Sequence, residues 1–172
     1  MFKMKIKDGW YKNKTWNGSI DKAFEAGLKR ERGNNNKANC LQIQGCLLLL
    51  NTQKNIQEVG TVLLNRIFED FEQEHISVLM AKECLGDYYL QQQQYYQAAA
   101  HYNWVHTETG KQLSAGGTSG LVPIKLADAL FHLDAATHQI QIKALLANFS
   151  IAALKTPKSK QYHAQLISKI NF

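Results

Sequence analysis

The sequence predicts an all-α protein built from antiparallel helical hairpins and closed by a C-terminal capping helix. The long segments between turn signals are rich in Leu, Ala, Gln, Lys and Glu, which lose little side-chain freedom in a helix. No segment alternates apolar with polar residues over the length of a strand, so the period of two that marks a sheet is missing. Two prolines, Pro123 and Pro157, interrupt the 172 residues. These observations favour helices throughout.

A chain of this length lies within the range of a single domain, about 100–200 residues. We therefore expect one helical domain over residues 1–172. Residues 1–18 are dense in Lys, Asn and Gly and carry Trp10, Tyr11 and Trp16 without helical spacing. They predict an aromatic and basic N-terminal extension whose rings pack back onto a helix.

Helical spacing of apolar residues predicts the first four helices. Ser19 is the expected N-cap of the first, and Ile20, Phe24 and Leu28 form its apolar stripe. A polar turn joins the second and third helices into a hairpin, and Ser77 is the expected cap of the fourth. The four predicted ranges are 19–32, 37–50, 56–71 and 78–91.

The remaining helices are separated by one clear break. A fifth helix is predicted over 95–113, followed by a Gly-rich loop over 114–122, because several glycines cost too much backbone entropy inside a helix. A sixth helix follows over 123–137 and a seventh from 138 or 139 to 154. Thr156 and Pro157 combine a capping hydroxyl with a first-turn proline, so the last helix is expected to reach Ile170.

Charge is unevenly distributed along the chain. Residues 1–37 hold ten Lys/Arg against four Asp/Glu, residues 38–113 hold four against eight, and residues 114–172 hold six against two. Because acidic residues interrupt the basic N-terminal part, it predicts a solvated surface rather than a nucleic-acid interface. The apolar run 47–50 is far shorter than the ~20 residues of a membrane span, so no membrane partner is expected.

Three cysteines, Cys40, Cys46 and Cys84, lie in or beside apolar runs. An odd number in such surroundings favours buried thiols over a disulfide framework. This predicts a reducing compartment and a cytoplasmic location.

The fourth and fifth helices resemble the tetratricopeptide repeat. Leu85, Gly86 and Tyr89 match its first helix, and Ala98 and Tyr102 match its second. The whole chain also resembles small bacterial proteins of this type. The resemblance implies hairpins stacked as a short right-handed α-solenoid. The chain departs from the repeat at two positions, where Val105 replaces an alanine and Gly110 replaces the closing proline.

The first hairpin matches the repeat less closely. Gly45 fits the helix-A glycine, but Leu48 replaces the tyrosine. Val59 and Leu63 fit the helix-B positions when two extra residues are allowed in the turn. We therefore expect a degenerate repeat here.

Proteins of this family hold a peptide or protein on the inner face of their stacked helices, so the resemblance implies a non-catalytic protein-interaction module. In the sixth helix Lys125, Asp128 and His132 recur at three- and four-residue steps and so share one face. The expected partner-binding residues are Asn39, Gln42, Glu83, Asp87, Gln91, Lys125, Asp128 and His132. The alternative interpretation is that these are ordinary solvated positions.

No catalytic, cofactor or metal site is expected. His101 and His106 are five residues apart, on different sides of a helix, so they predict satisfied or exposed side chains rather than metal ligands. The Gly-rich loop lacks the Gly-Lys-Ser/Thr sequence that opens a phosphate-binding helix. The loop is expected to be a spacer between hairpins or a flap beside the inner face of the stacked helices.

Two other functions stay open. One is an immunity-type inhibitor whose acidic patch blocks a basic toxin. The other is an RNA-binding helical repeat that stacks bases on Trp10, Tyr11 and Trp16. Self-association through exposed end hairpins also stays open.

Overall fold

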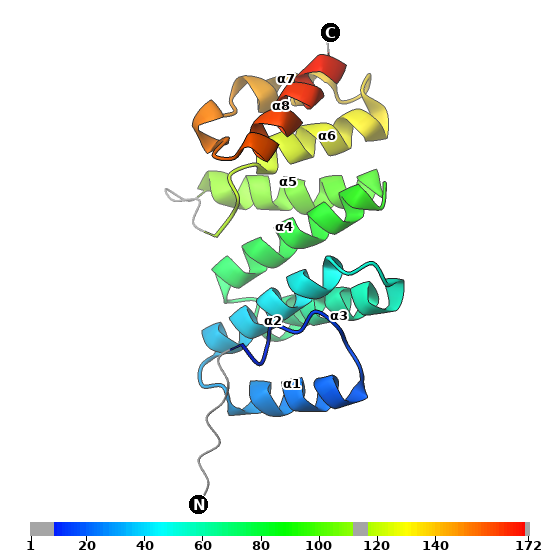
Figure 1. Cartoon of the computed structure of the whole chain (residues 1–172). Coiled ribbons are helices and arrows are strands. Elements are labelled where there is room, and N and C mark those ends of the chain that lie inside the picture. The colour runs from blue at the N-terminus through cyan, green and yellow to red at the C-terminus, as the bar shows by residue number, and fades with distance from the viewer. Residues whose placement is uncertain (1–8, 112–116, 171–172) are drawn as a thin grey trace, which may run out of the picture. The chain divides into compact units, whose positions relative to one another are not determined.

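The computed structural model describes residues 9–111 and 117–170, and every regular element within those ranges is a helix (Figure 1). The all-α prediction is confirmed for these residues. The chain divides into two compact units, Met1–Ala81 and Lys82–Phe172, with the boundary inside one helix, α4 (His75–Gln91). Residues 1–8 of the predicted extension, 112–113 of the predicted fifth helix and 114–116 of the predicted Gly-rich loop lie outside the described residues.

The first unit holds α1 (Gly18–Arg30), α2 (Asn34–Leu49), α3 (Lys54–Asp70) and the start of α4. The cap of α1 is Asn17, whose Oδ1 accepts hydrogen bonds from the backbone N–H of Ser19 and Ile20 at 3.0 Å. The prediction of Ser19 as the cap is wrong, because Asn17 stands two residues earlier and is an equally good capping residue. Ser77 likewise lies within α4 and does not cap it.

Two glycines set the contact between α2 and α3. A Cβ atom on Gly45 would lie 2.7 Å from the Leu64 side chain, and one on Gly60 would lie 2.9 Å from the Gly45 carbonyl oxygen. The two backbones therefore approach as closely as glycine permits. The nearest atoms to a Cβ on Gly45 belong to Leu64 and Gly60, each one position after the predicted Leu63 and Val59.

The segment before α1 packs onto the helices of this unit. The Trp10 ring lies over Gly27 and 5.3 Å from the Phe24 ring, and Trp16 lies 5.4 Å from the same phenyl ring. Asn13 and the buried Gln44 hydrogen-bond in both directions, with the Gln44 amide donating to the Asn13 carbonyl oxygen at 2.7 Å. The aromatic rings pack back onto a helix, as expected.

The second unit holds the rest of α4, then α5 (Tyr95–Lys111), α6 (Val122–Asp134), α7 (Gln139–Ala147), a 3₁₀ turn (Ile151–Ala153) and α8 (Pro157–Lys169). Helix α6 packs against both α5 and α7 (Figure 1). The seventh helix ends before the predicted Leu154, because the chain leaves the helix at Asn148 and enters the 3₁₀ turn. The Thr156 cap is confirmed, since its hydroxyl accepts from the Ser159 N–H at 3.1 Å.

One of the three cysteines agrees with expectation and two do not. Cys40 is a buried free thiol, and burial raises its pKa to about 11. Cys46 and Cys84 are disulfide-bonded, so the prediction of free thiols is wrong for these two residues. These two cysteines therefore do not support the prediction of a reducing compartment.

Helices α4 and α5 approach each other closely at Gly86. A Cβ atom there would lie 2.6 Å from Cε1 of Tyr102, whose ring is fully buried. The ring has little freedom to move aside, because its hydroxyl donates a hydrogen bond to Asp87 at 2.6 Å. The glycine of the repeat motif is therefore required by packing.

Replacing Gly86 with Ala is expected to lower the free energy of unfolding by about 2–3 kcal/mol, because the added methyl overlaps the Tyr102 ring. Gly110→Ala is the matched control in α5, where an added Cβ meets nothing within 4 Å, and it should gain about 0.5–1 kcal/mol. Urea unfolding of both variants measures the difference. Equal effects of the two substitutions would contradict the packing assignment.

Candidate functional site

A buried ion cluster in the second unit brings together three of the predicted site residues. The Lys125 ammonium on α6 lies 2.8 Å from Oε1 of Glu83 and 2.7 Å from Oδ1 of Asp87, both on α4. The Lys125 and Glu83 side chains are 13% and 8% exposed, whereas that of Asp87 is 42% exposed. One cation thus bridges two carboxylates that are one helical turn apart.

Neighbouring hydroxyl and amide groups fix these carboxylates in place. Asp87 Oδ1 accepts from the Tyr102 hydroxyl of α5 at 2.6 Å. Glu83 accepts from the backbone N–H of Ser119 at 3.0 Å and from the Ser119 hydroxyl. Ser119 lies in the predicted Gly-rich loop, so the described part of that loop is neither a bare spacer nor a free flap. The cluster joins α4, α5, α6 and the loop.

Glu83 and Lys125 stay ionised at neutral pH. Burial alone would raise the pKa of Glu83, but the charge and hydrogen bond of Lys125 and the hydrogen bonds of Ser119 outweigh it, so the pKa is lowered. Burial alone would lower the pKa of Lys125, but Asp87 and Glu83 raise it. The stabilisation is therefore lost only as pH falls through the lowered pKa of Glu83 or rises through the raised pKa of Lys125.

A third carboxylate, Asp128, lies further along α6. Its Oδ2 accepts from the Tyr162 hydroxyl of α8 at 2.7 Å, and its Oδ1 lies 3.5 Å from Nε2 of His132. The His132 ring stacks on Tyr95 with centroids 4.8 Å apart. Burial, then Asp128 and Asp87, raise the pKa of Tyr162. Asp128 stands three residues after Lys125 on α6, so the two side chains share one face of the helix.

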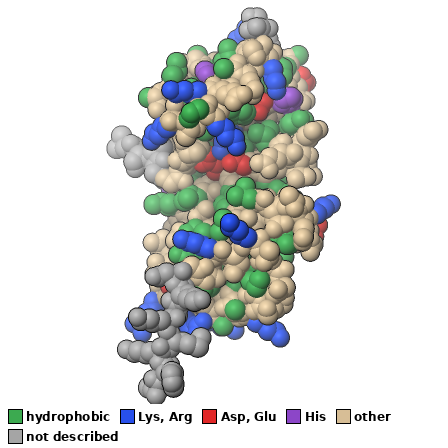
Figure 2. All heavy atoms as spheres, viewed as in Figure 1, with side chains coloured by type: hydrophobic (Ala, Val, Ile, Leu, Met, Phe, Trp, Pro, Cys, Tyr) green, Lys and Arg blue, Asp and Glu red, His purple; other side chains and the backbone are tan. Residues whose placement is uncertain are grey.

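We call this surface the polar face. It comprises eight side chains: Glu83, Asp87, Tyr102, Ser119, Lys125, Asp128, His132 and Tyr162. Lys125 contacts two of the three carboxylates, Glu83 and Asp87, and Asp128 has no lysine partner, so carboxylates outnumber lysines on this face. Figure 2 shows Asp and Glu side chains gathered on the face in view at the level of α4 and α5, with Lys side chains above them. Asp87 and His132 are its most accessible predicted members.

The structure brings together five of the eight predicted partner-binding residues. Glu83, Lys125 and Asp128 are buried or nearly so, and the interpretation of solvated positions is wrong for them. Gln91 is exposed at the last residue of α4. Asn39, which is exposed, and Gln42, which is buried, lie on α2 in the first unit.

Sequence reasoning missed the hydroxyl groups that hold the carboxylates. The sequence predicts Tyr102 and Tyr162 as packing residues, because apolar residues recur beside them at helical spacing. That spacing does not show where a tyrosine hydroxyl points. Ser119 carried no signal within the Gly-rich loop. Gly120 there has φ +74°, a left-handed conformation that favours glycine.

His101 on α5 is a second unexpected feature. Its ring stacks on Tyr89 with centroids 5.4 Å apart, and its buried Nδ1 has no hydrogen-bond partner. Burial, followed by the charge of Lys82, lowers its pKa to about 4. The prediction of a satisfied or exposed histidine is therefore wrong for His101, whereas His106 is exposed.

Comparisons of the chain with protein-family models, curated proteins and solved structures found no match. Over residues 9–111 and 117–170, no three His, Cys, Asp or Glu side chains are grouped so as to hold a metal ion. Within the same ranges no helix has the length and apolar content needed to cross a membrane. The assignment of a function therefore depends on the geometry of the polar face.

The half-buried His101 makes stability depend on pH below neutrality. Its pKa rises from about 4 in the folded protein to the ordinary 6.5 on unfolding, so the unfolded chain binds the extra proton. Stability should therefore fall between pH 6.5 and pH 4, by about 1–2 kcal/mol after allowance for the partly exposed ring. His101→Phe should remove this part of the pH dependence, measured by urea unfolding at several pH values. His106→Phe is the matched control, and the two variants behaving alike would refute the assignment.

Proposed function

We propose that this chain is a non-catalytic protein-interaction module that binds a basic peptide or protein surface on the polar face of its second unit. The observation that carries the proposal is the preorganised excess of carboxylates, of which Asp87 is 42% exposed beside a buried lysine. We further propose that the helical hairpins form a tetratricopeptide-like solenoid. The close contact of Gly86 with Tyr102 supports this arrangement.

A cationic partner fits the charges of this face. Asp87 shares Lys125 with Glu83, so its carboxylate is only partly neutralised from within the protein. The Tyr102 and Tyr162 hydroxyls hold Asp87 and Asp128 in fixed orientations, which lowers the entropy lost on binding. A lysine or arginine side chain supplies charge-assisted hydrogen bonds to such oxygens.

The protonation states support binding rather than acid–base chemistry. With its pKa lowered, Glu83 is a carboxylate at neutral pH, and with its pKa raised, Lys125 is an ammonium. Neither group exchanges a proton near pH 7, as a general acid or base must. Their charges instead supply a constant field at the surface.

The same excess of carboxylates favours one further candidate, an immunity-type inhibitor that covers the basic active site of a toxin. Electrostatic complementarity of this kind speeds association and selects the partner. The RNA-binding alternative receives less support, because Trp10 and Trp16 pack on Phe24 of α1.

The test is affinity capture of the tagged chain from its own cell lysate, with and without nuclease, followed by titration of the recovered protein. Asp87→Asn keeps the shape of the side chain and removes its charge, so it should weaken binding about tenfold, the value of one charge-assisted hydrogen bond. Glu69→Gln, an exposed position on α3, is the matched control and should bind like the wild type.

Binding that survives nuclease and weakens in Asp87→Asn supports the proposal, and the activity of the captured protein separates an adaptor from an inhibitor. Unchanged affinity of a folded Asp87→Asn protein would reject the polar face as the site. Capture that is lost with nuclease would favour the RNA-binding alternative.

A further inference from the structure

Asp128 is a nearly buried carboxylate that lacks a strong cationic partner within the described residues. The residue is 8% exposed, and its Oδ2 accepts a hydrogen bond from the Tyr162 hydroxyl at 2.7 Å. Its Oδ1 lies 3.5 Å from Nε2 of His132, which is too long for a hydrogen bond and forms an ion pair only when the imidazole is protonated. A buried carboxylate is costly unless it is paired and hydrogen-bonded. One oxygen of Asp128 is therefore suited to a donor from a partner.

Flat aromatic rings stand beside this oxygen. The His132 ring stacks on the Tyr95 ring with centroids 4.8 Å apart and planes inclined by 14°. Tyr95 is the first residue of α5, and His132 lies in the last turn of α6. The His132 side chain is 33% exposed, and Tyr95 is half-buried. An accessible pair of parallel rings thus lies next to a carboxylate.

A second carboxylate, that of Asp87, reinforces the negative charge here. Lys125 stands three residues before Asp128 on one face of α6, and its ammonium lies 2.7 Å from Oδ1 of Asp87. Burial, and then the charges of Asp128 and Asp87, raise the pKa of the Tyr162 hydroxyl, so both carboxylates act on the group that Asp128 accepts from. A cation bound at Asp128 is therefore attracted by two carboxylates.

We propose that the partner of the polar face presents an arginine, whose guanidinium pairs with Asp128 and stacks on the rings of His132 and Tyr95. This inference rests on the proposed function, which it narrows from a basic partner to one that bears an arginine. A guanidinium is planar, is always charged, donates two parallel hydrogen bonds to a carboxylate and stacks on aromatic faces. A lysine ammonium is a compact, strongly hydrated point charge without a plane that can stack.

A lysine of the chain itself occupies the other cation position of the polar face. The Lys125 ammonium lies within 3 Å of carboxylate oxygens of both Glu83 and Asp87, which stand one helical turn apart on α4. That position suits a point charge, because its donors reach two carboxylates in different directions. Asp128 instead combines a single carboxylate with flat rings, an arrangement that suits a planar ion.

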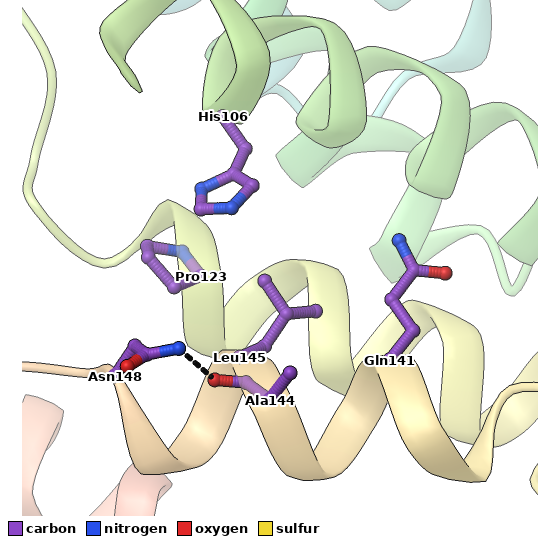
Figure 3. A pocket seen from close by; sticks show the side chains of 6 residues that line it. All are labelled: His106, Pro123, Gln141, Ala144, Leu145 and Asn148. Atoms are coloured by element: carbon purple, nitrogen blue, oxygen red, sulfur yellow. Dashed lines mark hydrogen bonds between the residues drawn. The ribbon is translucent and has the colours of Figure 1, made fainter.

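His106 is the matched control for His132, because it is an exposed histidine of the same unit in different surroundings. It lines a cavity of about 240 Å³ between α5 and α7, where its ring extends toward Pro123 and the Leu145 and Gln141 side chains extend from α7 (Figure 3). The described residues that line this cavity include no Asp or Glu. Removal of the His106 ring should therefore leave arginine binding unchanged.

The experiment measures the dissociation constants of hexa-arginine and hexa-lysine peptides, which carry equal charge, by calorimetric titration of the full chain in about 50 mM NaCl. The wild type should bind the arginine peptide about tenfold more tightly, the value of one added charge-assisted hydrogen bond. His132→Ala should reduce this preference about threefold, because it removes the stacking contact. Asp128→Asn still accepts from Tyr162 and should abolish the preference, whereas His106→Ala should keep it. Circular dichroism verifies that each variant is folded.

Equal affinities of the wild type for the two peptides would overturn the inference, as would a preference that both His132→Ala and Asp128→Asn retain. The proposed function survives either result if both peptides bind and both lose affinity in Asp87→Asn. A wild type that binds neither peptide would reject the basic partner and the arginine together.

Discussion

The ammonium of Lys125 is the group on which the polar face of the second unit depends. It lies within 3 Å of carboxylate oxygens of both Glu83 and Asp87 and is largely withdrawn from water. Removal of one partner from a buried ion pair costs about 3–5 kcal/mol, because the other partner is left charged and unpaired. An exposed pair contributes about 0–1 kcal/mol. The position of α6 relative to α4 is therefore constrained by charge as well as by apolar packing.

The second unit presents two surfaces of different chemistry. The polar face combines three carboxylates with one buried lysine, and hydroxyl groups from α5 and α8 hold them in place. Two cavities between α5 and α7 combine apolar side chains such as Leu126 and Leu130 with amide and imidazole groups, and no charged residue lines them among the described residues. Association at the polar face should weaken with salt.

The sequence predicted relations between residues on one helix more accurately than relations between helices. Glu83 and Asp87, and Lys125, Asp128 and His132, recur at helical spacing, so their common face could be predicted, as could the contact of Gly86 with Tyr102. The hydrogen bond from Tyr162 to Asp128 spans 34 residues, and helical spacing carries no information on such a distance. Leu64 and Gly60 face Gly45, one position after the predicted Leu63 and Val59, because helical spacing does not fix how two helices align along their lengths. Asn17 and Ser19 are both good caps, so capping preference alone could not choose between them.

The most direct test of the role of Lys125 is native-state amide hydrogen exchange, which reports the opening free energy of each helix. Lys125→Met should lower that free energy together in α5, α6 and residues 82–91 of α4, by about 3 kcal/mol. Lys111→Met is the matched control, because Lys111 is 63% exposed and pairs with Glu108 at the surface, and it should change exchange by less than about 0.5 kcal/mol. A loss confined to α6, or no loss in any of these helices, would contradict the account.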